Sequence, residues 1–212
     1  GRRGRARLVH RPAAAAQVAA ALRLQGRRGL HQALRPCVEF AARHGAEGIG
    51  RQRRAIAALE RGDKVAATAR DVSSLDDLTA TFGDALLPIT LDVTDRDADF
   101  AAVKQAHEHF GRLDIVVNNA GYGQFGFIEE LSEQEARDQI ETNVFGALWI
   151  TQAALPYLRA QRSGHIVQVS SIGGITAFQN VGIYHASKWA LEGFSQALAQ
   201  ESAADLAKKL AN

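Results

Sequence analysis

A tyrosine and a lysine four residues apart offer acid–base chemistry in the C-terminal part of the sequence. In the stretch YHASK, Tyr184 and Lys188 lie at positions i and i+4 of a predicted helix, so their side chains share one face. A nearby ammonium stabilises the phenolate form of a tyrosine, which suits the hydroxyl for proton exchange at neutral pH. Taken alone, the pair is equally compatible with an ordinary helix surface, so its meaning depends on the residues that precede it.

Three further polar positions follow or interrupt predicted elements upstream. Ser171 comes after the strand-like run HIVQV, thirteen residues before Tyr184, and a serine there can hydrogen-bond a carbonyl oxygen as charge develops on it. The run 118–121 (NNAG) follows LDIVV, and its small residues allow a flat ligand to lie close to the backbone. Asn143 falls inside a helical stretch, where asparagine is unfavourable, so it is either tolerated or marks a local break that binds water. Each position also has an ordinary interpretation as a turn, a cap or a tolerated residue.

Strands and helices alternate around these positions. Hydrophobic periodicity predicts strands at 64–68, 86–91, 113–117 and 165–169, and helices at 75–82, 97–110, 132–160 and 184–200. The helix at 132–160 is expected to bend near Pro156. Alternating strands and long helices imply right-handed crossovers and a parallel sheet. The prediction is a doubly wound α/β fold, which binds ligands at the carboxyl ends of its strands.

The four motifs together resemble the signature of the short-chain dehydrogenase/reductase family over residues 64–200. The resemblance implies a Rossmann-like fold and an NAD(P)-dependent oxidoreductase that moves hydride between the cofactor and a carbonyl or alcohol. It implies that Tyr184 is the general acid/base and that Ser171 polarises the carbonyl. It further implies that Lys188 assists Tyr184 and holds the nicotinamide ribose, and that Asn143 holds a water in a proton relay.

The same resemblance indicates where a cofactor would bind. The family's acidic residue at the end of the second strand is replaced here by Ala69, and Arg70 follows it. Because arginine pairs with a 2′-phosphate that a carboxylate would repel, NADP(H) is expected rather than NAD. Asp92 and Val93 resemble the family's adenine-contacting pair. The implied cofactor-binding residues are Gly45, Gly48, Ile49, Gly50, Arg70, Asp92, Val93, Asn118, Ala120, Gly121, Tyr184 and Lys188.

Both ends of the sequence depart from the family. The nearest match to its TGxxxGxG phosphate turn is 44–50 (HGAEGIG), one residue short and beginning with histidine. The strand expected before it, 38–43 (VEFAAR), is interrupted by charges. After residue 201 the sequence continues only as 202–212 (SAADLAKKLAN), which reads as the end of a helix, without the family's sixth and seventh strands. We therefore expect residues 37–212 to form an incomplete Rossmann-like domain with an atypical first strand region and a truncated C-terminal end.

Residues 1–36 form a basic, low-complexity stretch that we expect to be a disordered leader. Up to residue 61 there are 14 arginines, no lysine and 3 acidic residues, whereas the remainder has 11 basic and 20 acidic residues. The absence of lysine favours a leader or an out-of-frame stretch. An arginine-rich arm that binds nucleic acid is the alternative, and its binding would depend strongly on salt.

Composition limits the remaining possibilities. A single cysteine, Cys37, excludes an internal disulfide and fits a cytoplasmic location. No apolar run approaches the roughly 18 residues of a membrane span, and no histidine spacing suggests a metal site. We predict an enzyme that acts on a small ketone, aldehyde or alcohol, with neither nucleic acid nor membrane as a partner, and that forms a homo-oligomer as the family commonly does. The alternative is an inactive, truncated or frame-damaged paralogue that does not bind cofactor.

Overall fold

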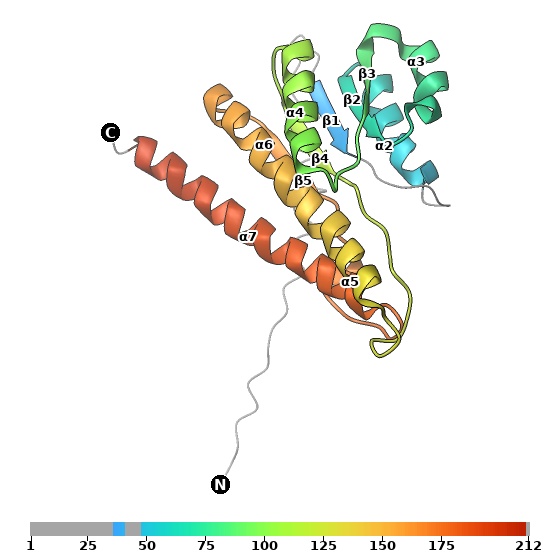
Figure 1. The fold of residues 1–212 in the computed structure, drawn as a ribbon. Helices are drawn as coiled ribbons and strands as arrows, with labels where there is room; N and C mark the ends of the chain where they lie inside the picture. The colour runs from blue at the N-terminus through green and yellow to red at the C-terminus, as the bar shows by residue number, and fades with distance from the viewer. Residues whose placement is uncertain (1–35, 41–47, 211–212) are drawn as a thin grey trace. The chain divides into compact units, whose positions relative to one another are not determined.

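A computed structural model describes residues 36–40 and 48–210, with side chains from residue 54 to residue 202 (Figure 1). The strands are β1 (Pro36–Phe40), β2 (Lys64–Ala69), β3 (Leu86–Thr90), β4 (Ile115–Asn118) and β5 (His165–Gln168). The helices are α2 (Gly48–Glu60), α3 (Asp76–Phe82), α4 (Arg96–Phe110), α5 (Glu133–Ile140), α6 (Gly146–Gln161) and α7 (Gly182–Leu210). The predicted alternation of strands and helices is confirmed. The predicted leader, apart from Pro36, lies outside the described residues.

The five strands form one parallel sheet in the order β3-β2-β1-β4-β5. β1 is central, because it pairs in parallel with β2 on one side and with β4 on the other. The sequence places a charge-interrupted strand at 38–43, whereas the observed strand is Pro36–Phe40. Its two neighbours engage its backbone groups on both edges, and these ladder hydrogen bonds form whatever the side chains are.

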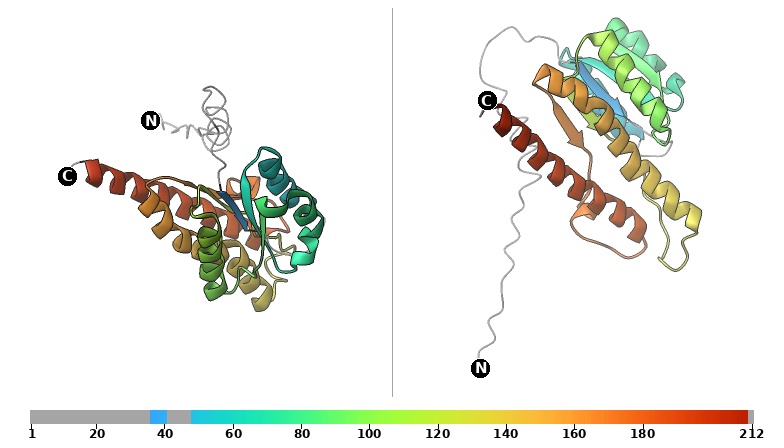
Figure 2. Two further views of the ribbon diagram at one scale, coloured as in Figure 1. Left: turned by 90° about the horizontal axis from the view of Figure 1, so that it is seen from above. Right: turned by 60° about the vertical axis from the view of Figure 1, so that its left-hand side comes forward.

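Helices cover both faces of the sheet, and β2 shows how the faces are separated. Ala66 belongs to a core cluster built with residues of α4 and α6. Val65 and Ala67 belong to a second cluster built with residues of α2. Successive strand residues point to opposite faces, so this alternation places α4 and α6 on one side and α2 on the other (Figure 2).

The expected single helix at 132–160 is divided into three parts. Ser132 caps α5 in a capping box with Glu135. One turn of π-helix, η3 (Glu141–Phe145), then separates α5 from α6. The interruption therefore lies around Asn143, whereas Pro156 lies within α6 without ending it. The regular helix is interrupted at Asn143, and the bend expected near Pro156 stays a prediction.

One buried carboxyl group lies in the α4 side of the core. Asp99 is 0% exposed, and neither of its carboxylate oxygens has a hydrogen-bond partner in the described structure. Burial, together with the charges of Asp95 and Asp92, raises the pKa of Asp99 from 3.8 to about 8. The side chain is therefore mostly protonated at neutral pH.

Candidate active site

Tyr184 and Lys188 lie on the first turns of α7, as their spacing predicts. Lys188 is buried at 7% exposure, and its Nζ donates a hydrogen bond to the carbonyl oxygen of Val169 at 2.9 Å. Val169 follows β5, so the lysine is fixed against the carboxyl end of the sheet. The ammonium lies 5.8 Å from the centroid of the Tyr184 ring. The two side chains whose spacing predicts a shared face therefore lie side by side.

Ser171 and Tyr184 flank the same glycine. The hydroxyl oxygen of Ser171 accepts a hydrogen bond from the amide of Gly173 at 3.1 Å. A Cβ added at Gly173 would lie 3.3 Å from Cε1 of Tyr184 and 2.5 Å from Nδ1 of His185. The chain therefore needs glycine here to bring the serine loop against the tyrosine ring.

Asn143 ties the loop after β4 to α7. Its Oδ1 accepts from the amide of Tyr122 at 3.0 Å, and its Nδ2 donates to the Tyr122 carbonyl at 2.9 Å. The same Nδ2 donates to the Ser187 hydroxyl at 3.0 Å. Asn143 is 0% exposed. Both amide hydrogens are thus used within the protein, and the predicted break in the helix is confirmed, while the predicted water stays a prediction.

Gly121 lies where these groups converge. A Cβ at this position would approach Asn143 Oδ1 to 3.0 Å and Lys188 Nζ to 3.6 Å. The end of β4, the break between α5 and α6, and the start of α7 therefore meet at one point. The structure brings together Gly121, Asn143, Tyr184 and Lys188, which the sequence assigns to one site.

Two supporting residues were not identified from the sequence. Gln139 in α5 is fully buried, accepts from the Gln124 amide at 2.7 Å and donates to the Tyr122 carbonyl at 2.9 Å. His185 is 4% exposed and contacts both ends of the loop 173–178, which precedes α7. Its ring contacts the Gly173 carbonyl at 3.1 Å and accepts a hydrogen bond from the Phe178 amide at 2.8 Å. Gln139 lies on the same helical face as Ala136 and Ile140, and this position could have indicated its burial. His185 follows Tyr184 directly, but no sequence motif used above indicates a role for it.

The predicted adenosine-binding residues gather at the ends of β2 and β3. Arg70 Nη1 lies 3.9 Å from Asp92 Oδ2, and both side chains are partly exposed. Such an exposed pair contributes little stability, so it does not fix the arginine. Asp92 also accepts from the amide and hydroxyl of Thr94. Val93 is buried against α6, where a Cβ at Gly146 would lie 2.8 Å from its carbonyl oxygen.

Asn118 faces the interior rather than the open end of the sheet. Its Nδ2 donates to the Ala147 carbonyl at 3.2 Å and to the Thr151 hydroxyl at 3.0 Å. The backbone carbonyl oxygen of Asn118 accepts a hydrogen bond from the amide of Val169. Its described contacts therefore hold β4 against α6 and the end of β5, which supports the site from below.

The predicted phosphate turn lies between β1 and α2. Gly48, Ile49 and Gly50 are the first residues of α2, whereas Gly45 lies outside the described residues. A helix of 13 residues that starts after the central strand of a parallel sheet presents its free amides to that edge. The start of α2 thus fits a pyrophosphate, and Gly121 keeps the neighbouring strand end clear of a side chain.

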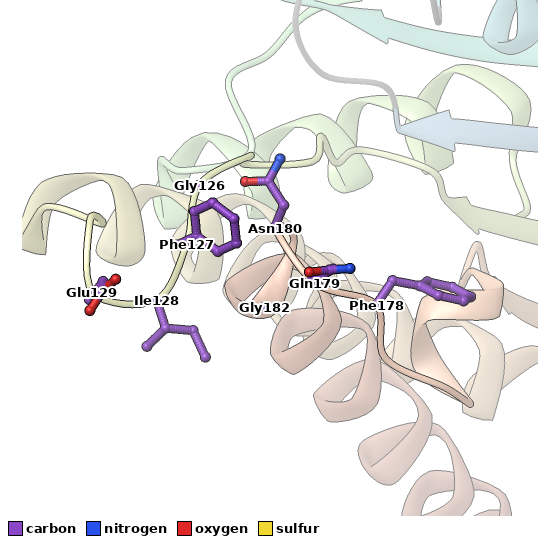
Figure 3. A pocket seen from close by; sticks show the side chains of 8 residues that line it. All are labelled: Gly126, Phe127, Ile128, Glu129, Phe178, Gln179, Asn180 and Gly182. Atoms are coloured by element: carbon purple, nitrogen blue, oxygen red, sulfur yellow. The ribbon is translucent and has the colours of Figure 1, made fainter.

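Two loops next to Tyr184 enclose a cleft of about 440 Å³, which we call the loop cleft. Residues 126–129 line it from the loop after β4, and residues 178–180 with Gly182 line it from the loop before α7 (Figure 3). Phe127, Ile128 and Phe178 supply large apolar side chains that are at least half exposed. The volume is within the usual range for small-molecule sites.

Two features are absent from the described part of the chain. No three His, Cys, Asp or Glu side chains gather there as a metal site would require. None of its helices is both long enough and apolar enough to cross a membrane.

Comparison with known sequences gives a consistent result. Residues 44–206 match the sequence model of the family described as short chain dehydrogenase. The oxidoreductase BOA17 of Botryotinia fuckeliana is 46% identical over 150 residues, which is 70% of this chain and 55% of that protein. A 3-ketodihydrosphingosine reductase of Bacteroides thetaiotaomicron is 43% identical over 113 residues, 53% of this chain and 42% of that protein. The chain thus spans about half the length of these curated relatives.

Solved structures agree with the sequence comparison. A short-chain dehydrogenase from Streptomyces avermitilis superposes with a TM-score of 0.75 at 39% identity, covering 82% of this chain and 62% of that one. ElxO with NADP bound gives a TM-score of 0.74 at 27% identity, over 81% and 69% of the two chains. NAD⁺-bound xylitol dehydrogenase gives 0.72 at 25% identity, over 80% and 65%. Both kinds of nicotinamide dinucleotide therefore occur among the similar structures.

Proposed function

The chain belongs to the short-chain dehydrogenase family of NAD(P)-dependent oxidoreductases, and from this premise we propose that it interconverts a ketone or aldehyde and the corresponding alcohol with NADP(H). The observation that carries the proposal is the buried Lys188 ammonium, held by Val169 and 5.8 Å from the Tyr184 ring. Burying a lysine ammonium is costly unless it is hydrogen-bonded or lies near a negative charge. A phenol that must lose and regain a proton supplies such a charge.

In the proposed reduction, Tyr184 gives its hydroxyl proton to the carbonyl oxygen of the substrate. Ser171 donates a hydrogen bond to the same oxygen and so stabilises the charge that develops on it. The Lys188 ammonium stabilises the phenolate that remains until a proton returns from solvent. The dinucleotide, when bound, supplies the hydride that reaches the carbonyl carbon. Oxidation of an alcohol follows the same steps in reverse.

Asn143 is proposed to keep this machinery in place and to lie on the route of proton return. Its bonds to Tyr122 and Ser187 fix the loop after β4 against α7. Its Oδ1 accepts one hydrogen bond within the described structure, so a second lone pair is available for a water. That water would join Lys188 to solvent.

For the cofactor we propose NADP(H), held by the start of α2, by Arg70, Asp92 and Val93, and by the strand end that includes Asn118, Ala120 and Gly121. Tyr184 and Lys188 would hold the nicotinamide ribose. Arg70 decides the preference, because its guanidinium can leave the loose contact with Asp92 and pair with a 2′-phosphate. ElxO, a similar chain, is known with NADP bound.

A fluorescence titration of the purified chain with NADPH and then NADH tests the proposal. Saturable binding of both, tighter for NADPH, is the expected result. In the variant Arg70→Ala the Kd for NADPH should rise about 10- to 100-fold while that for NADH stays within about twofold, since one charge-assisted contact is lost. Absence of binding to either nucleotide would instead favour the inactive paralogue.

A further inference from the structure

The loop cleft has walls that are unusually apolar for an exposed surface. Phe127 is 50% exposed, Phe178 56% and Ile128 80%, and all three line it. Figure 3 shows Phe127 and Ile128 on one loop and Phe178 on the other. Large apolar side chains gathered at one exposed place mark a surface that binds something apolar.

The two walls are held together by backbone contacts. The amide of Gly126 donates to the Asn180 carbonyl at 3.0 Å, and Gly126 also forms a parallel bridge with Val181. The two walls also approach each other closely at Gly182, where an added Cβ would lie 3.0 Å from Cγ1 of Ile128. The backbone contacts of Gly126 with Asn180 and Val181 fix the separation of the walls without using their apolar side chains.

His185 fixes the Phe178 wall from within. Because the Phe178 amide must donate, Nε2 of His185 accepts this hydrogen bond at 2.8 Å. Nδ1 then carries the hydrogen of the neutral ring and donates it to the Gly173 carbonyl at 3.1 Å. The two contacts span the loop from residue 173 to residue 178. The apolar wall is therefore preorganised, which lowers the entropic cost of binding.

The loop cleft lies beside the segments that carry the catalytic residues. Gly182, which lines it, precedes Tyr184 by two residues on α7. In the segment that leads into the other wall, a Cβ at Gly123 would lie 3.8 Å from both the Phe125 and the Tyr184 rings. A molecule whose carbonyl lies at Tyr184 therefore has the loop cleft next to it for the rest of its structure.

The charge around the loop cleft is acidic. Glu129 lines it, and the neighbouring Glu130 accepts from the Phe127 amide at 3.1 Å. Hydrogen bonds from the side chain and backbone of Ser132, together with one from Gln124, lower the pKa of Glu135 and keep it ionised. None of the described residues that line the loop cleft is a lysine or an arginine. An anionic substrate would meet repulsion there without any compensating partner.

We propose that the loop cleft binds the uncharged alkyl or aryl part of a ketone or secondary alcohol and discriminates against substrates with a carboxylate or phosphate at that end. The inference rests on the proposed function, because it assigns the reacting carbonyl to Tyr184. It adds a substrate class: neutral molecules with an apolar tail.

Matched ketones test the assignment. We expect kcat/KM with NADPH to rise from 2-butanone to 2-octanone, by up to about fourfold for each methylene that becomes buried. The compound 7-oxooctanoate has the same length as 2-octanone but ends in a carboxylate, and its kcat/KM should be at least about tenfold lower. Equal use of 2-octanone and 7-oxooctanoate would overturn the proposal.

Two variants of the same loop separate the loop cleft from general effects. Phe178→Ser should flatten the dependence on chain length, while its backbone bond to His185 remains. Ile175→Ser is the control, since Ile175 is 54% exposed in the same loop but does not line the loop cleft. The control should keep the native dependence. A Phe178→Ser variant with the native dependence would contradict the inference.

A binding assay distinguishes failure of the inference from failure of the proposed function. The neutral dye N-phenyl-1-naphthylamine should bind the native chain without nucleotide and be displaced by 2-octanone, more weakly in Phe178→Ser than in Ile175→Ser. This result without any ketone reduction would refute the proposed function and retain the apolar site. Reduction of ketones without dye displacement and without dependence on chain length would retain the function and refute the apolar site.

Discussion

Replacing the buried carboxyl of Asp99 should change how stability depends on pH. In the folded chain the pKa of Asp99 is raised from 3.8 to about 8, first by burial and then by Asp95 and Asp92. Between these values the folded chain keeps the proton and the unfolded chain releases it. Unfolding then releases one proton, so stability falls as the pH rises through this window.

The magnitude follows from the width of the window. One proton released per unfolding event costs about 1.4 kcal/mol of stability per pH unit, so the three units from about pH 5 to about pH 8 amount to about 4 kcal/mol. Asp99→Asn removes the ionisation and leaves the other groups unchanged. The free energy of unfolding of the variant relative to the native chain should therefore increase by about 4 kcal/mol across this range.

Urea unfolding followed by circular dichroism at the two pH values measures this difference. Asp97→Asn is the matched control, because Asp97 lies in the first turn of the same helix with its side chain 96% exposed. The control should follow the native chain at both pH values. If Asp99→Asn shows the same pH dependence as the native chain, the description of Asp99 as a buried protonated acid is wrong.

Two further predictions concern the site. Ser171→Ala should lower kcat about 10²- to 10³-fold without changing the Kd for NADPH, because a donor to the developing charge is lost; Ser170→Ala, which removes a buried hydroxyl that has no partner in the described structure, is the control and should keep the native kcat. Gln139→Leu should lower the stability by about 1–3 kcal/mol in a thermal or urea melt, because the Gln124 amide loses its described partner and the Tyr122 carbonyl keeps only its hydrogen bond from Asn143 among those described here. Native stability in this variant would show that Gln139 does not hold the loop.

The site could be predicted from sequence where its residues follow strands. Parallel strands bring their carboxyl ends to one edge, so residues after β4 and β5 had to meet whatever the details of packing. The pairing of Tyr184 with Lys188 depended only on helical periodicity. Both predictions needed only the local sequence and the rule that parallel strands bring their carboxyl ends to one edge of the sheet.

Other features depended on contacts that no local pattern contains. The unfavourable asparagine marked the place of the break at Asn143, but the contacts that hold it are to Tyr122, twenty-one residues away. The bend expected near Pro156 stays a prediction. His185 acts through two backbone groups of a loop whose path was unknown. Asp99 did carry a signal, since it lies on the same helical face as the buried Val103 and Ala106.

Prediction and structure can be compared least well near the ends of the sequence. The β1 strand takes the central position in spite of its charge pattern, and α2 begins where the altered glycine turn should end. The leader and Gly45 lie outside the described residues, and assembly into a homo-oligomer stays a prediction. Whether the turn still holds a pyrophosphate is therefore decided by nucleotide binding rather than by its match to a motif.

The central claim is that Tyr184 exchanges the proton in a nicotinamide-dependent reaction. The most direct test compares the native chain with Tyr184→Phe for NADPH binding and for NADPH-dependent reduction of 2-octanone under the same conditions. We predict that the two bind NADPH with similar Kd, and that only the native chain forms the alcohol at a measurable rate. Reduction by Tyr184→Phe at the native rate would contradict the claim.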